Sequence, residues 1–196
     1  SLNVDEYPES IDQVLFAIYY IGVENITLFS SKELTKDIKS KIRKSLTCMT
    51  GTEITYEDQK KIVIKVLLDK EKVDITQILY RITLIIEMSI SDLTGLFDLE
   101  EIRMNENEID RLYHLMTKIV LLSLINPNVL HTSKVRNVSL IPAYFLISKK
   151  LENIADNIYH IAEFQGKPPQ AVHEVLNTVK DSLKRSMSHL LSEQPN

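Results

Sequence analysis

The chain has 196 residues, 44% of them apolar and 26% charged, which is typical of a globular protein large enough to bury a hydrophobic core. The net charge of −4 argues against nucleic acid as a partner, and the single cysteine, Cys48, excludes an internal disulfide and a cysteine-rich zinc site. The apolar runs Ile82–Ile86 and Ile119–Ile125 are too short for membrane insertion, and Ser1–Pro8 does not resemble a signal peptide, so a cytoplasmic location is expected.

Residues 1–69 are predicted to form a small α+β unit, the first of two expected domains. Apolar residues recur at helical spacing over Glu9–Tyr20, and Gly22 follows as the glycine that commonly ends a helix. Apolar and polar residues then alternate over Asn25–Phe29, which indicates a strand with one buried face. The unit is therefore expected to open with a helix followed by a strand.

A second helix and a β-hairpin are expected to complete this unit. Ser30 and Ser31 offer an N-cap for a helix that continues to about Leu46. β-Branched and aromatic residues alternate over Thr52–Tyr56 and over Lys61–Leu68, on either side of a polar turn. This pattern predicts two paired strands.

Residues 70–196 are predicted to be helical throughout. Apolar residues follow the i, i+3, i+4 spacing of amphipathic helices over Ile75–Leu96, Asn105–Ile125 and Ser139–Phe164. We therefore expect the second domain to be an antiparallel helical bundle, which makes the fold class mainly α.

A fourth amphipathic helix is expected over Gln170–Ser192. When it is aligned with the first bundle helix, Val175 and Leu176 fall on Ile78 and Leu79, which suggests that a second bundle repeat begins here. The alternative is that any two amphipathic helices can be aligned in some register. A bundle of three helices covers only part of this fourth helix, so we expect a homodimer that covers the rest.

A short phrase recurs in two of the bundle helices, as ENEIDRLYHL and as ENIADNIYHI. Each copy places a glutamate, an aspartate and a histidine at four-residue steps along one side of its helix: Glu106, Asp110 and His114 in the first, and Glu152, Asp156 and His160 in the second. Converging carboxylates on neighbouring helices are the ligands that hard cations prefer.

Two interpretations of these carboxylates stay open. The first ladder flanks its apolar stripe, and Glu152 and Asp156 lie nearer the outer face of their helix, so all four side chains could simply be solvated. The repetition instead favours a shared cation site. Because the carboxylates lie outside the apolar stripes, a bound metal is expected on the bundle surface.

Several segments resemble PhoU-domain proteins, and most of them resemble the archaeal branch of that family. LENIADNIYHIAE (Leu151–Glu163) is similar to the third-helix signature of the family, NENEIDRLYHLM (Asn105–Met116) to the archaeal second helix and RITLIIEMSISDL (Arg81–Leu93) to the first. Ala17–Phe29 and Thr50–Asp69 resemble the stretch that precedes the first bundle in archaeal relatives. The resemblance therefore covers nearly the whole chain.

The resemblance implies a non-enzymatic regulator of phosphate uptake and phosphate signalling, which acts on phosphate transporter components or on a signalling or transcription partner. It also implies an iron or zinc-type transition metal at Glu106, Asp110, Glu152 and Asp156, with Asp92 as a weaker additional ligand. The sequence departs from the family in having His160 and Asn153 where the signature has asparagine and arginine, and in lacking the AbrB-like DNA-binding domain and most of the second bundle. Direct operator binding by this chain is therefore not expected.

Two other function classes compete with this interpretation. A carboxylate-bridged di-iron enzyme would need Glu-x-x-His pairs that project into the bundle, and the histidines here follow the aspartates by four residues instead. A structural assembly module would have the same helices and bind no metal. Metal content distinguishes the regulator with a metal site from the structural module.

Overall fold

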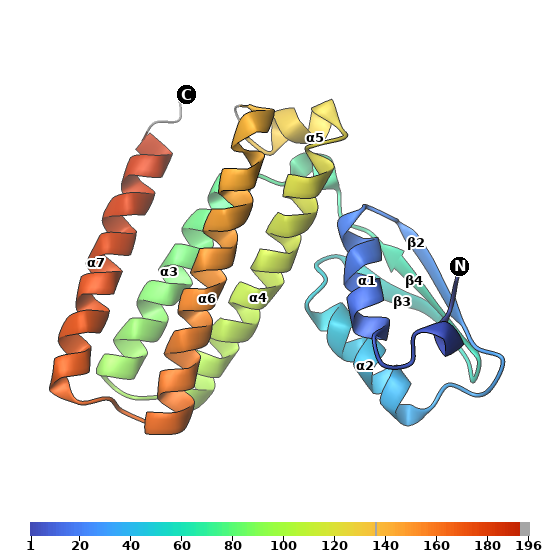
Figure 1. Cartoon of the computed structure of the whole chain (residues 1–196), viewed down its shortest axis with the longest axis horizontal. Helices are drawn as coiled ribbons and strands as arrows, with labels where there is room; N and C mark the ends of the chain where they lie inside the picture. Colours follow the sequence, from blue (N-terminus) through green and yellow to red (C-terminus); the bar gives the residue numbers. More distant parts are fainter. Residues whose placement is uncertain (136, 193–196) are drawn as a thin grey trace. The chain divides into compact units, whose positions relative to one another are not determined.

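The computed structural model describes residues 1–135 and 137–192, which form a helical bundle preceded by a small α+β unit (Figure 1). The elements in chain order are β1 (Leu2–Asn3), η1 (Val4–Glu6), α1 (Ile11–Tyr20), β2 (Asn25–Phe29), α2 (Lys36–Thr47), β3 (Thr52–Glu57), β4 (Lys61–Val66), η2 (Lys70–Lys72), α3 (Ile75–Thr94), α4 (Leu99–Leu122), α5 (Pro127–Thr132), η3 (Val138–Leu140), α6 (Ile141–Gln165) and α7 (Gln170–Ser192). The predicted fold class, mainly α with an α+β unit in front, is confirmed.

The chain forms two compact units, and neither is one continuous stretch of sequence. The first comprises Ser1–Val73 and the described part of His114–Ile141, and the second comprises Asp74–Tyr113 and the described residues from Pro142 onward. Helix α4 therefore contributes residues to both units. A division into domains of residues 1–69 and 70–196 stays a prediction.

The first unit is built on a four-stranded sheet with the strand order β1-β2-β4-β3. Strand β1 runs parallel to β2, and the other neighbours are antiparallel. In the central pair, Ile26 lies opposite Ile64 and Leu28 opposite Ile62, and all four are buried on the face that α1 and α2 cover (Figure 1). The side chains between them point to the other face, which explains the alternation in the sequence.

Helix α2 begins at Lys36, later than the start predicted from Ser30 and Ser31. Its N-cap is Thr35, whose Oγ1 accepts a hydrogen bond from the amide of Ile38 at 3.3 Å. The hydroxyls of Ser30 and Ser31 instead donate to the carboxylate of Asp5, each at 2.6 Å. The predicted cap at Ser30 or Ser31 is therefore wrong, because a residue distant in sequence engages both hydroxyls.

Within the first unit, the end of α1 packs against the C-terminal part of α4. The Nζ of Lys118 lies 3.9 Å from the ring centre of Tyr19. Gly22 ends α1 with a φ of 83°, a left-handed conformation that favours glycine, and a Cβ at this position would lie 2.7 Å from a methyl of Leu122. The glycine is thus required both by its backbone conformation and by close packing.

The short helix α5 was not predicted. Its start is set by Asn126, whose Oδ1 accepts hydrogen bonds from the amides of Asn128 and Val129, and by Pro127 in the first turn. These residues were interpreted only as a break between longer helices. Six residues are too few to show a helical period in the sequence.

Helices α3, α6 and α7 and the first part of α4 form the second unit and run side by side (Figure 1). Asp74 caps α3 by accepting a hydrogen bond from the amide of Thr76 at 2.8 Å, and α7 packs along α3. Helix α7 has the bounds that the sequence predicted. No helix among the described residues has the length and hydrophobicity required of a transmembrane span.

Helix α4 begins earlier and ends earlier than predicted. It starts at Leu99 instead of Asn105, because Asp98 accepts hydrogen bonds from the amides of Glu100 and Glu101 and so caps the helix. The polar first turns concealed this extension, since only one buried apolar residue, Ile102, precedes the predicted start. The added turns precede Glu106 and Asp110 on the same helix.

Candidate metal centre

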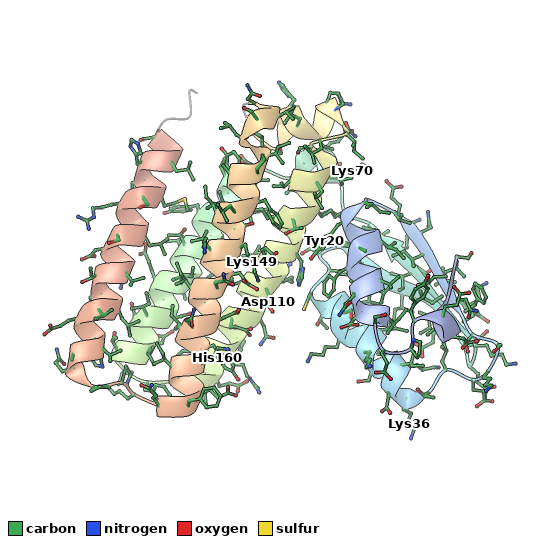
Figure 2. All side chains as sticks on the ribbon, in the orientation of Figure 1. Tyr20, Lys36, Lys70, Asp110, Lys149 and His160 are labelled. Carbon is green, nitrogen blue, oxygen red and sulfur yellow. The ribbon has the colours of Figure 1, made fainter. Side chains whose placement is uncertain are left out.

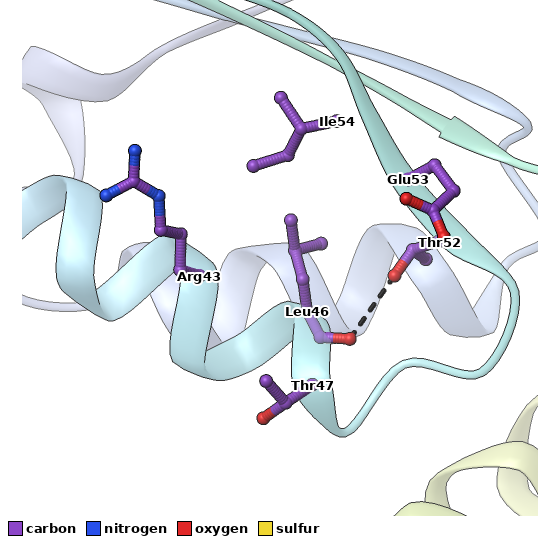
Figure 3. Close-up of a pocket in the computed structure, with 6 residues that line it drawn as sticks. All are labelled: Arg43, Leu46, Thr47, Thr52, Glu53 and Ile54. Carbon is purple, nitrogen blue, oxygen red and sulfur yellow. Dashed lines mark hydrogen bonds between the residues drawn. The ribbon is translucent and has the colours of Figure 1, made fainter.

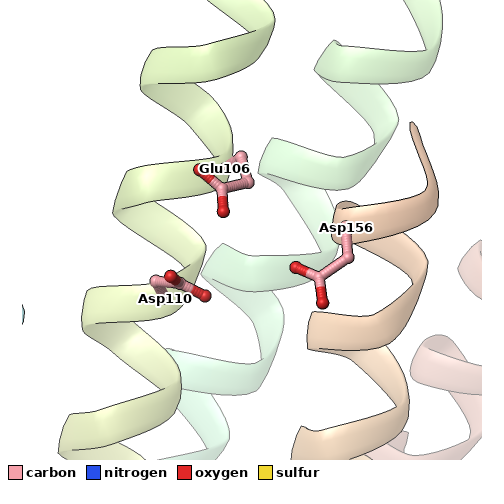
Figure 4. Close-up of side chains that lie close together, drawn as sticks. All are labelled: Glu106, Asp110 and Asp156. Atoms are coloured by element: carbon pink, nitrogen blue, oxygen red, sulfur yellow. The ribbon is translucent and has the colours of Figure 1, made fainter. Parts of the chain in front are cut away.

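Three carboxylates converge where α4 faces α6. Glu106 and Asp110 lie one turn apart on α4, and Asp156 approaches them from α6 (Figure 4). One oxygen from each lies within 4.8 Å of an oxygen of the others, and all three residues are half-buried. The structure thus brings together three of the four carboxylates that the sequence singled out.

The packing of the two helices explains this convergence. Ile109 on α4 and Ala155 on α6 are buried in the bundle, and each is followed by an aspartate that lies 100° further around its helix. Asp110 and Asp156 therefore lie at the edges of the two apolar stripes. Glu106 lies one turn before Asp110 on the same edge.

Glu152 lies near this group but has a different partner. The Nζ of Lys149 lies 2.6 Å from each of its carboxylate oxygens, and the same ammonium lies 5.2 Å from the ring centre of Tyr113. Only 9% of Glu152 is exposed, whereas the sequence placed it toward the outer face of its helix. That expectation is corrected, because an ion pair allows the carboxylate to be buried.

Burial and the neighbouring carboxylates strongly perturb Asp110. Burial, followed by the negative charges of Glu106, Asp156 and Glu152, raises the pKa of Asp110 to about 7, and the positive charge of Lys149 offsets only part of this. The normal pKa of an aspartate is near 4. At neutral pH the group therefore favours an added positive charge, either a proton or a cation.

The oxygen-only ligand set suits a hard cation such as Mn²⁺ or iron. Helices α4 and α6 alone bring three candidate oxygen ligands together. The iron or zinc-type metal expected from the sequence stays a prediction.

Residues 96–165 match the PhoU domain. The chain contains a PhoU domain. All four carboxylates lie within the matched residues. No curated protein and no solved structure matches the chain.

PhoU-domain proteins regulate phosphate homeostasis and are not enzymes, which supports a regulatory role in phosphate homeostasis for this chain in general. The match ends at the last residue of α6 and leaves α7 outside it.

Neither histidine of the recurring phrase joins the carboxylates of the PhoU domain. His114 stacks on Phe16, with ring centres 4.1 Å apart, and its Nδ1 shares a hydrogen bond with the hydroxyl of Tyr20. His160 lies toward the exposed end of α6 and stacks against Phe164 (Figure 2). The four-residue spacing alone therefore did not distinguish ligand positions from packing positions.

Asp92, the weaker additional candidate, lies elsewhere in the second unit. It lines an open cleft of about 350 Å³ between α3 and α7, together with Leu84, Met88 and Lys180. Burial and the charge of Asp98 raise the pKa of Asp92. The metal group assembled among the described residues does not include this carboxylate.

The first unit has an open groove of its own. It lies between α2 and the edge strand β3, has a volume of about 360 Å³ and is lined by Arg43, Leu46, Thr47, Thr52, Glu53 and Ile54 (Figure 3). The hydroxyl of Thr52 lies 3.3 Å from the carbonyl oxygen of Leu46 (Figure 3) and 2.8 Å from that of Met49. This mixed lining does not select one class of ligand.

Lys149 and Tyr113 are site residues that the sequence analysis missed. Lys149 precedes Glu152 by three residues, a spacing at which helical side chains meet, so the ion pair could have been predicted. The position of Tyr113 beneath the ammonium depends on how α4 and α6 pack, and the sequence carries no signal for it.

Proposed function

We propose that the chain is a non-enzymatic regulator of phosphate uptake or phosphate signalling, which acts through protein contacts and binds a transition-metal cation at Glu106, Asp110 and Asp156. The observation that carries the metal site is the convergence of three half-buried carboxylates from two helices of a PhoU domain. Glu152 is the fourth ligand of the proposal, and its carboxylate is paired with Lys149. The phosphate transporter or a signalling partner, and the likeness to archaeal members, stay predictions.

Elemental analysis tests the metal site. Wild-type protein purified without chelators should contain about one transition-metal ion per chain, and the double variant Asp110→Asn/Asp156→Asn should contain less than a tenth of that, because two of the four carboxylate ligands are neutralised. Glu101→Gln, an exposed position on α4, is the matched control and should retain the metal. Wild-type protein without transition metal would contradict the proposal and favour the structural module.

We also propose a homodimer that covers the exposed side of α3 and α7. On α3, Tyr80, Leu84 and Met88 recur at four-residue steps and are each at least 40% exposed, and on α7 Val175 is 62% exposed. Large contiguous patches of exposed apolar side chains are uncommon on a monomer. Charged side chains such as Lys180 border it and suit an interface rim.

Light scattering checks the oligomeric state. The protein should have about twice the 22.6 kDa mass of one chain, and Leu84→Glu/Met88→Glu should shift it toward the monomer, because two carboxylates would be buried in the interface. Lys36→Glu, an exposed position in the first unit, should leave the mass unchanged. A wild-type monomer at high concentration would refute the dimer.

A further inference from the structure

Lys149 supplies a positive charge to the carboxylate group from within the chain. Its ammonium lies 2.6 Å from both oxygens of Glu152 and 5.2 Å from the ring centre of Tyr113. It interacts electrostatically with Asp110 and Asp156 as well. The charge of one ammonium therefore acts on carboxylates of both helices.

The two partners of this ion pair differ in their freedom to move. The side chain of Glu152 is 12% exposed, whereas that of Lys149 is 42% exposed and ends a flexible four-carbon chain. Lys149 can therefore turn toward solvent without opening the apolar core. Glu152 cannot leave the helix interface in the same way, so loss of Lys149 would leave it beside Asp110 and Asp156.

We propose that Lys149 is a tethered counter-ion that competes with a metal cation for the carboxylates and thereby sets the affinity of the site. This inference rests on the proposed metal site. A divalent cation among Glu106, Asp110 and Asp156 would be repelled by the nearby ammonium. Metal binding must therefore either displace Lys149 from Glu152 or occur against the positive charge of Lys149. Either effect weakens the binding of the metal.

This arrangement also makes the site selective for charge. In the metal-free protein Lys149 already neutralises one carboxylate at no loss of translational entropy, since it is part of the chain. A monovalent cation that displaced Lys149 would replace one positive charge by another, so its binding would gain little free energy. A divalent cation adds charge to the group and can compete with the lysine.

Lys149→Met in the full-length chain tests the proposal. Removing one positive charge near the carboxylates should tighten Mn²⁺ binding roughly tenfold, measured by calorimetry at constant pH. Lys149→Gln, which retains hydrogen-bonding capacity and serves if the methionine variant folds poorly, should show the same change. Lys149→Arg keeps the charge and should bind within about twofold of wild type.

Lys150→Met is the matched control, because it removes an exposed lysine from the next position of the same helix and should leave the affinity unchanged. An independent readout is the melting temperature in EDTA. Lys149→Met should lower it, since Glu152 loses its partner, whereas Lys150→Met should not.

The outcomes separate the two proposals. Tighter Mn²⁺ binding by the two neutral Lys149 variants, with unchanged binding by the arginine variant, supports the tethered counter-ion. If wild-type protein binds Mn²⁺ and the neutral variants bind it equally or more weakly, the role of Lys149 is refuted while the metal site stands. If neither wild type nor any variant binds Mn²⁺, the metal site is refuted and the role of Lys149 with it.

Discussion

Asp110→Asn is expected to stabilise the metal-free protein and to abolish its stabilisation by metal. In EDTA at pH 8, the free energy of unfolding should rise by about 2 kcal/mol, roughly half the full linkage value, because the half-buried carboxyl is partly screened by solvent. Urea unfolding measures this gain. With Mn²⁺ present, wild type should gain stability by binding and the variant should not.

The pH dependence of this effect follows from the raised pKa. The folded protein holds a proton on Asp110 up to about pH 7, whereas the unfolded chain releases it near 3.8. Between these values the folded state binds more protons, so the wild type loses stability as pH rises and the full cost applies above pH 7. The advantage of Asp110→Asn should accordingly vanish below about pH 4.

An exposed aspartate provides the control. Asp181→Asn on α7 removes the same charge from a solvated position and should change the unfolding free energy by less than about 0.5 kcal/mol at either pH. If Asp110→Asn instead destabilises the metal-free protein at pH 8, the carboxylates do not repel one another as inferred, and Asp110 has a structural role.

The expected gain in stability of Asp110→Asn distinguishes carboxylates placed to bind a cation from carboxylates that stabilise the fold. The raised pKa of Asp110 means that its ionised carboxylate weakens the metal-free fold, and a merely structural bundle would gain by replacing it. Lys149 offsets part of the repulsion. A cation bound from solution would offset the repulsion that remains.

Local patterns predicted most of the elements. The alternation over Asn25–Phe29 and the apolar stripe of Gln170–Ser192 gave the bounds that the structure has, because each period reflects burial of one face. The cap of α2 could not be found in this way. Asp5, which engages Ser30 and Ser31, is separated from them by an entire helix.

The same limit applies to the site. The four-residue steps placed Glu106 with Asp110 and Glu152 with Asp156 on common helix faces, and the structure agrees with that geometry. The spacing could not show that Asp156 would face α4 while Glu152 would pair with Lys149. Those outcomes depend on how the two helices are rotated against each other, which is a tertiary property.

Lys118 is a second charged residue whose burial the sequence concealed. It lies within the apolar run that ends α4, is 2% exposed and has its ammonium over the ring of Tyr19. Burial lowers the pKa of Lys118 to about 8, with a smaller contribution from the charge of Lys70 and partial compensation by Glu24. The position of Lys118 within the apolar stripe of α4 fits this burial.

Lys118→Met is therefore expected to stabilise the protein at pH 7. The lowered pKa corresponds to a cost of about 3 kcal/mol, and loss of the contact with Tyr19 removes about 1 kcal/mol, so the unfolding free energy should rise by about 2 kcal/mol. Lys36→Met, an exposed position on α2, should change it by less than about 0.5 kcal/mol. Urea unfolding at pH 7 measures both.

The pH profile of this variant distinguishes burial of charge from simple repacking. The unfolded chain keeps the proton of Lys118 up to about pH 10.5, whereas the folded protein loses it near 8, so between these values the unfolded state binds more protons and wild-type stability rises with pH. Below pH 8 the full cost applies. The advantage of Lys118→Met should thus be largest at pH 7 and shrink toward pH 10. An advantage that is the same at both values would mean that methionine only packs better, and a loss at pH 7 would mean that the contact with Tyr19 outweighs the cost of burial.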